Sequence, residues 1–421
     1  MECLLHYVWQ YKLYDNAEQT TTEGGVFTVL DSGLHNTDSG PDFFNAKLKC
    51  NEAVWVGNVE IHTYASDWYK HGHQTDKAYD SVILHVVEHA DAVVYRTNGE
   101  VIPQIELSIP DHVKQNYTTL IKEAHGVSCI KHLDKLPPFE LSAWMTVLLS
   151  ERLERKTNDI FNHLKRNSND WNETFYIILC RSFGVGINSD AFEYLAKSLP
   201  LRILLKHRDQ PIQIEALLFG QAGLLNDTLS DEYYQRLQTE YQFLKHKYQL
   251  KSVEGSLYKT MRIRPANFPH IKLAQLAALY IQCDTLFSRM IASRDATSLR
   301  NLFKITPSAY WNTHYHFRCT STKSDKATGG NFLNIVLINT VAPLMYAYGI
   351  RHDDDVLQSI AIELLENLPA EVNFITSMFK KAGCRLEHAG DSQALIQLKR
   401  MYCEQKKCLY CRIGFRLLSE K

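Results

Sequence analysis

The sequence has no surplus of charge of either sign. Its 421 residues include 46 lysines and arginines and 47 aspartates and glutamates, which gives a formal net charge of −1. A protein that binds nucleic acid over its whole surface is usually strongly basic, so this balance leaves only local basic patches for such binding. Hydrophobic residues make up 45% of the chain, which is typical of a soluble globular protein long enough for two domains.

Long apolar segments are also missing. A membrane-spanning helix needs about 18 or more consecutive apolar residues. The longest candidate, residues 332–350, contains Asn334 and Asn339 and is expected to be a buried core helix. The N-terminus has an acidic residue at position 2, Glu2, and only a short apolar run, so we expect no signal peptide. The sequence therefore predicts a cytoplasmic protein without a membrane partner, whose cysteines are mostly reduced.

The chain shows no fixed-period repeat, and its organisation follows from a change in pattern. A predicted helix over residues 3–14 precedes short apolar runs bounded by turn residues, which predict strands, one of them over residues 92–96. From about Pro137 onward, apolar residues recur at helical spacing almost throughout. We therefore predict an α+β fold, with a small mixed β-sheet domain over residues 1–128 and a large all-α helical region over residues 129–421.

One predicted hairpin concentrates ionisable residues at its open end. Residues 43–50 alternate as expected of a strand, and residues 53–62 are rich in β-branched and aromatic side chains. Glu60 and His62 are two positions apart and point to the same side of their strand. With a two-residue loop, Asp42 faces away from Glu60, whereas a three-residue loop or an equivalent bulge places Asp42 opposite Glu60 or His62. We expect the second arrangement, in which Asp42 and Glu60 converge on a divalent cation.

The motif formed by Pro41-Asp42 and Glu60-Ile61-His62 resembles the PD-(D/E)xK nuclease-like superfamily, in which a Pro-Asp opens one strand and an acid-x-Lys lies on the next. The resemblance implies a restriction-endonuclease-like N-terminal domain, Mg²⁺ or Mn²⁺ held by Asp42 and Glu60, and nucleic acid as the substrate. His62 stands where the superfamily has the lysine that helps to hold and activate the attacking water. A histidine can act there as a base or as a metal ligand, so the catalytic set is Asp42, Glu60 and His62.

Two further histidines follow the hairpin. His71 and His73 are separated by one residue, so an extended backbone places both imidazoles on one side. His62 or Glu60 would then complete a set of ligands for a transition metal. The alternative is a solvated loop in which both histidines are merely polar.

Four residues are candidates for contacts with a substrate. Lys70 and Gln74 flank the histidine pair and can supply a phosphate contact. Arg262 and Arg264 precede Pro265 at a predicted helix entrance, where free backbone N–H groups favour an anion.

Three cysteines near the C-terminus have the spacing C-x4-C-x2-C. Three thiolates suit Zn²⁺ or an iron–sulfur cluster, each of which usually needs a fourth ligand. The alternative is a set of core thiols on a terminal helix, because reduced cysteine is among the most buried residue types. The three cysteines are Cys403, Cys408 and Cys411, and the candidate fourth ligands are Cys384, His388 and Cys3.

Over nearly its whole length, the chain resembles an uncharacterised bacterial family known as domain of unknown function 2851. The resemblance rests on residues 36–43, 57–62, 66–68, His71-x-His73, 82–87, 219–223, 264–269, 339–343 and 403–414. It implies no activity, so the function has to be inferred from the residues themselves.

Three functions remain open. The first is a metal-dependent phosphodiester hydrolase acting on nucleic acid, in which Asp42 and Glu60 hold Mg²⁺ or Mn²⁺ and His62 orients or deprotonates water. The second is a catalytically inactive nuclease-like scaffold with a structural zinc ion at the C-terminal cysteines. The third is a Zn²⁺ or Fe²⁺ hydrolase centred on His62, His71 and His73.

Overall fold

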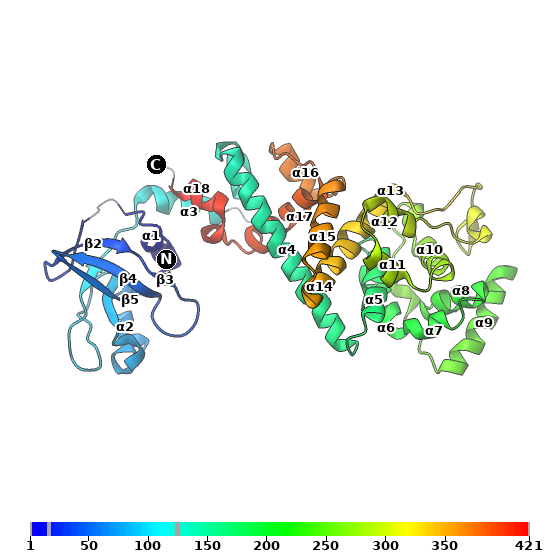
Figure 1. Cartoon of the computed structure of the whole chain (residues 1–421), viewed down its shortest axis with the longest axis horizontal. Coiled ribbons are helices and arrows are strands. Elements are labelled where there is room, and N and C mark those ends of the chain that lie inside the picture. Colours follow the sequence, from blue (N-terminus) through cyan, green and yellow to red (C-terminus); the bar gives the residue numbers. More distant parts are fainter. Residues whose placement is uncertain (1, 15–17, 123–126, 420–421) are drawn as a thin grey trace. The chain divides into compact units, whose positions relative to one another are not determined.

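The computed structural model describes residues 2–14, 18–122 and 127–419. It is 56% helical and 12% strand, with a mixed sheet in the N-terminal part and a large helical region after it, which confirms the α+β class (Figure 1). The chain divides into two compact units: unit 1 comprises Met1–Trp144 and Leu398–Lys421, and unit 2 comprises Met145–Gln397. Our sequence-based boundary lay at residues 128 and 129, whereas in the structure the last segment of the chain belongs to the same unit as the sheet.

Unit 1 is built around a mixed β-sheet. Its elements are α1 (Glu2–Gln10), β1 (Glu18–Thr20), β2 (Val26–Asp31), β3 (Leu34–His35), β4 (Phe43–Cys50), β5 (Ala53–Tyr64), α2 (Asp67–Lys70), η1 (His73–Thr75), η2 (Lys77–Tyr79), β6 (Val82–His89), β7 (Gln104–Glu106), α3 (Asp111–Lys122), η3 (Ser128–Lys135), the start of α4 (Pro138–Arg166), η8 (Leu398–Cys403), η9 (Cys408–Tyr410) and α18 (Arg412–Ser419).

The strands of this sheet are ordered β1-β2-β4-β5-β6-β7, and β3 also pairs with β4. Strands β2, β4 and β5 are antiparallel neighbours, whereas β5, β6 and β7 run parallel. A parallel neighbour requires a crossover connection, and here α2, η1 and η2 lie between β5 and β6. Strand β6 lies between β5 and β7 and is largely buried, and its sequence is accordingly a nearly continuous apolar run.

The β4–β5 hairpin shows which register the chain adopts. Cys50 pairs with Ala53, so the loop between them has two residues. A three-residue loop is therefore wrong. Continued without interruption, this register would turn Asp42 away from Glu60.

A β-bulge restores the expected arrangement. The register shifts between Phe43 and residue 46, so that Phe43 pairs with Val59 rather than with Glu60. Asn45 lies in the bulge with a φ of 57°, a left-handed conformation that asparagine adopts more readily than most residues. Asp42 thereby comes opposite Glu60, and the prediction of a bulge equivalent to the longer loop is confirmed.

The predicted strand over residues 92–96 is wrong. This segment forms only an isolated bridge between Tyr95 and Val101. The Arg96 side chain donates hydrogen bonds to the Asp80 and Val82 carbonyls and holds the segment in an irregular path.

Unit 2 is helical. Beyond the rest of α4, its elements are α5 (Trp171–Phe183), α6 (Ser189–Ser198), α7 (Leu201–Leu205), α8 (Pro211–Gln221), α9 (Glu232–Tyr248), η4 (Gly255–Leu257), η5 (Pro265–Asn267), α10 (Pro269–Gln282), α11 (Leu286–Ala292), α12 (Ala296–Leu302), η6 (Ala309–Thr313), β8 (His314–His316), β9 (Cys319–Thr320), α13 (Gly330–Val336), η7 (Leu337–Val341), α14 (Ala342–His352), α15 (Asp355–Asn367), α16 (Phe374–Lys381) and α17 (Ala389–Gln397).

Side-chain caps start several of these helices. Asp170, Asp231 and Asp354 each accept a hydrogen bond from a backbone N–H of the first turn of α5, α9 and α15, respectively. Each cap satisfies at least one of the N–H groups that a helix start leaves without a partner.

Residues Gly330–His352 are apolar and long enough to cross a membrane by length and composition alone, but 67% of their most apolar window is buried. This burial agrees with the predicted core helix.

One glycine allows two helices of unit 2 to pack closely. A Cβ atom on Gly220 of α8 would lie 2.0 Å from the ring of Tyr241 on α9. The Tyr241 hydroxyl donates a hydrogen bond of 3.0 Å to Gln221, so the ring has little room to move.

We expect Gly220→Ala to lower the free energy of unfolding by about 2 kcal/mol, because the cost of overpacking exceeds the gain in helix propensity. Urea denaturation followed by circular dichroism measures this loss. Gly330→Ala is the matched control, because a Cβ atom there meets nothing within 4 Å. Equal stability of the two variants would contradict the expected close packing.

Candidate metal centre

Two parallel strands and the connection between them bring a group of histidines together in unit 1. Strand β5 carries Glu60 and His62, and its parallel neighbour β6 places His85 in register with Glu60. His71 follows α2 and His73 begins η1, in the connection that leads from β5 to β6. The residues that meet here therefore come from three separate local elements.

The side chains of this group converge on one another. The ligand atoms of His62, His71 and His73 all lie within 4.8 Å of one another. His62 Nε2 lies 3.1 Å from His71 Nδ1. Glu60 Oε1 lies 3.2 Å from His73 Nε2 and 3.5 Å from His62 Nε2. Three imidazoles and one carboxylate are a typical ligand set for Zn²⁺ or a related first-row ion.

A hydrogen-bonded chain fixes the tautomer of His62. The Gln104 side-chain nitrogen donates to the Ala92 carbonyl at 2.9 Å, which leaves the Gln104 Oε1 to accept from His85 Nδ1 at 3.2 Å. With its proton on Nδ1, neutral His85 accepts at Nε2 from His62 Nδ1 at 2.8 Å. His62 Nε2 is then unprotonated, with its lone pair facing His71 Nδ1 at 3.1 Å. We call the chain Ala92–Gln104–His85–His62 the histidine relay.

The burial of the group matches an accessible metal site. His62 and His73 are buried, whereas His71 is exposed and marks the side open to solvent. Within the described residues, His73 Nε2 is buried and has no well-directed hydrogen-bond partner. Glu60 Oε1 lies 3.2 Å away but outside hydrogen-bond geometry, and a buried ring nitrogen without a well-directed partner is costly unless a ligand or ion occupies it.

Asp42 lies next to this group and is paired with a residue of α1. The Asp42 backbone N–H donates to Glu60 Oε2 at 3.1 Å, and Asp42 Oδ2 accepts from the Ile61 N–H at 2.9 Å. His6 Nε2 lies 3.4 Å from the same Asp42 oxygen. Asp42 and Glu60 therefore do converge as predicted, but nitrogen donors already face their oxygens.

Burial and mutual contacts set the charges of these groups. Burial lowers the pKa of His62 to about 3, with the neighbouring histidines adding to the effect, and burial lowers the pKa of His85 to about 4. Burial also raises the pKa of Glu60, against the opposing effect of His73. Burial alone would lower the pKa of His6 and raise that of Asp42, but their contact reverses both shifts. Near neutral pH, His62 is thus uncharged, and the contact with Asp42 favours the protonated form of His6.

The low pKa values predict acid sensitivity of the metal-free protein. A histidine whose folded pKa lies below the unfolded value of 6.5 stabilises the fold above pH 6.5, and this contribution is lost as pH falls towards the folded pKa. Between pH 7 and 5, we expect His62 and His85 each to cost about 2 kcal/mol of unfolding free energy. Urea denaturation with a chelator present measures this loss. An equal loss in a His62→Gln/His85→Gln double variant would contradict the assignment.

The other predicted contact residues near this site differ in their surroundings. Lys70 is exposed and pairs with Asp67 at 2.6 Å. Gln74 follows His73 in η1, and within the described residues its Oε1 is buried without a hydrogen-bond partner. Gln74 is therefore the better placed of the two to contact a bound molecule.

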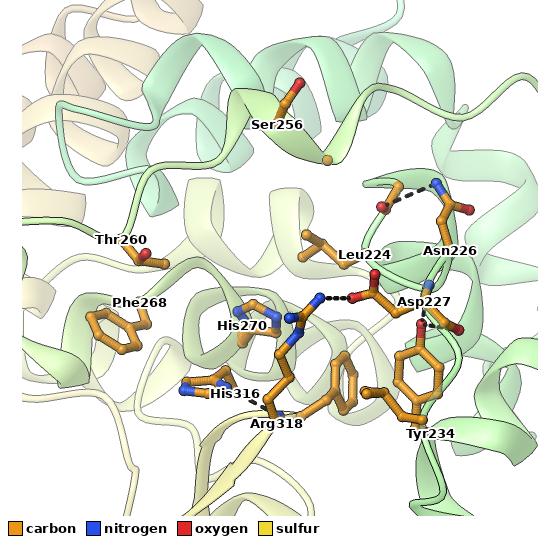
Figure 2. Close-up of a pocket in the computed structure, with 14 residues that line it drawn as sticks. Leu224, Asn226, Asp227, Tyr234, Ser256, Thr260, Phe268, His270, His316 and Arg318 are labelled. Atoms are coloured by element: carbon orange, nitrogen blue, oxygen red, sulfur yellow. Dashed lines mark hydrogen bonds and ion pairs between the residues drawn. The ribbon is translucent and has the colours of Figure 1, made fainter.

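Arg262 and Arg264 belong to unit 2, where both are exposed before η5. Unit 2 contains a pocket of about 630 Å³ near this segment, whose lining includes Phe268 and His270. Figure 2 shows Arg318 reaching across it to Asp227, with 2.7 Å between the charged groups. Since Asp227 already neutralises Arg318, we assign no anion to this pocket.

The predicted cysteine ligands fall into both units. Cys403, Cys408 and Cys411 lie in unit 1, as does Cys3, which is exposed on α1. Cys384 and His388 belong to unit 2. A residue not considered from the sequence, Cys129 of η3, lies in unit 1 beside the three late cysteines.

Sequence reasoning missed the partners that support the histidines. His6 and Gln104 lie far along the chain from the hairpin, and neither forms a recognisable spacing with it. His85, in the apolar strand β6, is buried and hydrogen-bonded to both His62 and Gln104. The only sign in the sequence that His85 has a special role was a histidine within an otherwise apolar strand. That sign did not reveal that His85 contacts His62.

Comparison with known proteins gives one match. The model of a family described as Protein of unknown function (DUF2851) matches residues 2–374, which include the whole sheet and most of unit 2. No curated protein and no solved structure matches the chain.

Proposed function

The chain belongs to the DUF2851 family, and because this membership assigns no activity, we propose from its own residues that it is a metal-dependent hydrolase. His62, His71 and His73, together with Glu60, hold one transition-metal ion. The observation that carries the proposal is the histidine relay, which leaves His62 Nε2 unprotonated and 3.1 Å from His71 Nδ1. Hydrogen bonds that fix the tautomer of a ligand are typical of metal-binding histidines.

A bound metal ion lowers the pKa of a water ligand and stabilises negative charge on a substrate oxygen. The residues of the chain would supply the remaining functions. Glu60 contributes an oxygen ligand next to His73. The protonated His6, held by Asp42, can donate a proton to a leaving group. Exposed His71 lies on the side from which substrate would enter.

Phosphodiester bonds of nucleic acid are the substrate that we propose. Two features support this choice. With the short strands β1 and β3 left aside, the order α1, β2, β4, β5 agrees with the helix and strands that open a nuclease-like core. The bulge also brings Asp42, just before β4, opposite Glu60 on β5, as that resemblance requires. His62 stands in the position of the superfamily's lysine and serves here as a metal ligand.

A site in which Asp42 and Glu60 alone hold Mg²⁺ fits less well. Mg²⁺ prefers oxygen ligands in an octahedral arrangement. Glu60 Oε1 faces two imidazole nitrogens, and Asp42 Oδ2 accepts from the Ile61 N–H and faces His6. A softer ion with mixed nitrogen and oxygen ligands matches these surroundings better.

The test compares metals on the full chain. The protein is stripped with a chelator, reloaded with Zn²⁺, Mn²⁺, Fe²⁺ or Mg²⁺, and assayed on single- and double-stranded DNA and RNA and on a chromogenic phosphodiester. We expect cleavage with a transition metal and none with Mg²⁺ alone. Cleavage with Mg²⁺ that persists in His71→Ala/His73→Ala would instead support the carboxylate site, and absence of cleavage with every metal would contradict the proposed activity.

A further inference from the structure

Four cysteines gather in unit 1, away from the histidine site in sequence. Cys403 ends η8, Cys408 begins η9, and Cys411 immediately precedes α18. Cys129 lies in η3, which packs against α18. The Cys129 thiol is close enough to interact electrostatically with all three late thiols, and the Cys403 thiol interacts with the other two late ones. The C-x4-C-x2-C segment thus meets a fourth cysteine from a distant part of the chain.

The backbone around the last two cysteines forms a tight turn that presents N–H groups to sulfur. The Cys411 N–H donates to the Cys408 carbonyl at 3.3 Å. A Cβ atom on Gly414 would lie 2.0 Å from this carbonyl oxygen, so only glycine fits there. The backbone N–H groups of Ile413 and Gly414 point to the Cys411 sulfur. Such N–H donors stabilise a thiolate bound to a metal and tune iron–sulfur clusters.

The chemistry of four clustered thiols favours a bound cation. All described cysteines are free thiols, so no disulfide joins these four. Cys411 is buried and the other three thiols are half-buried. Four thiolates gathered in this way would repel one another unless a metal compensates their charge, and metal binding would release the thiol protons.

We propose that Cys129, Cys403, Cys408 and Cys411 ligate an iron–sulfur cluster. Tetrahedral Zn²⁺, with Zn–S bonds of about 2.3 Å, holds its sulfurs about 3.8 Å apart. The C-x4-C-x2-C spacing of the three late cysteines is instead the one with which plant-type ferredoxins hold an iron–sulfur cluster. The ligands of a cluster bind different irons and are spaced more widely. The cluster would tie η3 to the C-terminal segment within unit 1, and Cys129 replaces the sequence-based candidates for the fourth ligand.

The test is the iron and acid-labile sulfide content of the full chain purified without oxygen, together with its visible absorption. We expect a brown protein that contains both. Cys129→Ser should lose iron, sulfide and colour, whereas Cys3→Ser and Cys319→Ser, which replace exposed cysteines, should keep them. A colourless protein containing stoichiometric zinc, a protein without metal at these residues, or a Cys129→Ser variant that retains its iron would each overturn the assignment.

A second measurement does not depend on folding of a variant. Native wild-type protein is treated with an alkylating reagent before and after removal of iron by acid and chelator, and modified cysteines are identified by mass spectrometry. We expect Cys129, Cys403, Cys408 and Cys411 to be protected together and to become reactive together. Free reaction of Cys129 while the other three stay protected would exclude it as a ligand.

Discussion

Replacing His73 with alanine is expected to remove the bound transition metal and, with it, hydrolysis. The change deletes the buried Nε2 atom that lies 3.2 Å from Glu60 Oε1. Loss of a residue that only supports a ligand typically weakens metal affinity about 10–100-fold, so loss of the ligand itself should weaken it by more than about 100-fold. Competition with a chromogenic chelator measures the affinity, and the phosphodiester assay measures the activity.

His89→Ala is the matched control for this variant. His89 lies on β6 like His85, but it is exposed and faces Glu106 at 3.9 Å. Its replacement should leave metal affinity and turnover unchanged. If His73→Ala bound the metal as tightly as His89→Ala, His73 would not be a ligand and the histidine centre would be wrong.

The Asp42→Asn variant should keep its metal and lose turnover. The amide oxygen can still accept from the Ile61 N–H, but the neutral side chain no longer holds His6 in its charged form. Loss of a positioned proton donor typically lowers the rate by about 10²–10⁴-fold. Metal content and turnover are measured on the same sample. Lower turnover per bound metal indicates that Asp42 acts in proton transfer, whereas an equal fall in both indicates that it is a ligand.

Asp38→Asn provides the control for Asp42→Asn, because Asp38 is exposed in the loop before β4. It should behave as the wild type. A drop in metal content that parallels the loss of turnover in Asp42→Asn would show that Asp42 is a ligand. That result would favour the oxygen-ligand site over the histidine centre.

The hairpin shows how far the sequence could specify this site. Strand periodicity predicted both strands, and the spacing of Glu60 and His62 put them on one face of β5. The register could not be decided, because a two-residue loop and a bulge have opposite effects on Asp42. Asn45 was the residue that mattered, since its left-handed backbone shifts the pairing by one position. No propensity of the flanking residues required a bulge at that position.

The predicted ligands and the missed ones differ in how they meet. His71 and His73 lie within a few residues of β5, so a local reading of spacing was enough to group them with His62. Gln104, His6 and Cys129 reach their partners only through the pairing of β6 with β7, the packing of α1, and the return of the C-terminal segment to unit 1. These are long-range contacts, and a single sequence carries no local pattern for them.

The position of the bound metal tests the central claim most directly. Crystals of the zinc- or manganese-loaded protein would reveal the ion by its anomalous scattering. The histidine centre predicts a peak about 2.0–2.2 Å from His62 Nε2, His71 Nδ1 and His73 Nε2, with Glu60 at a similar distance. A peak held by Asp42 and Glu60 without the histidines, or no peak in this part of unit 1, would contradict it.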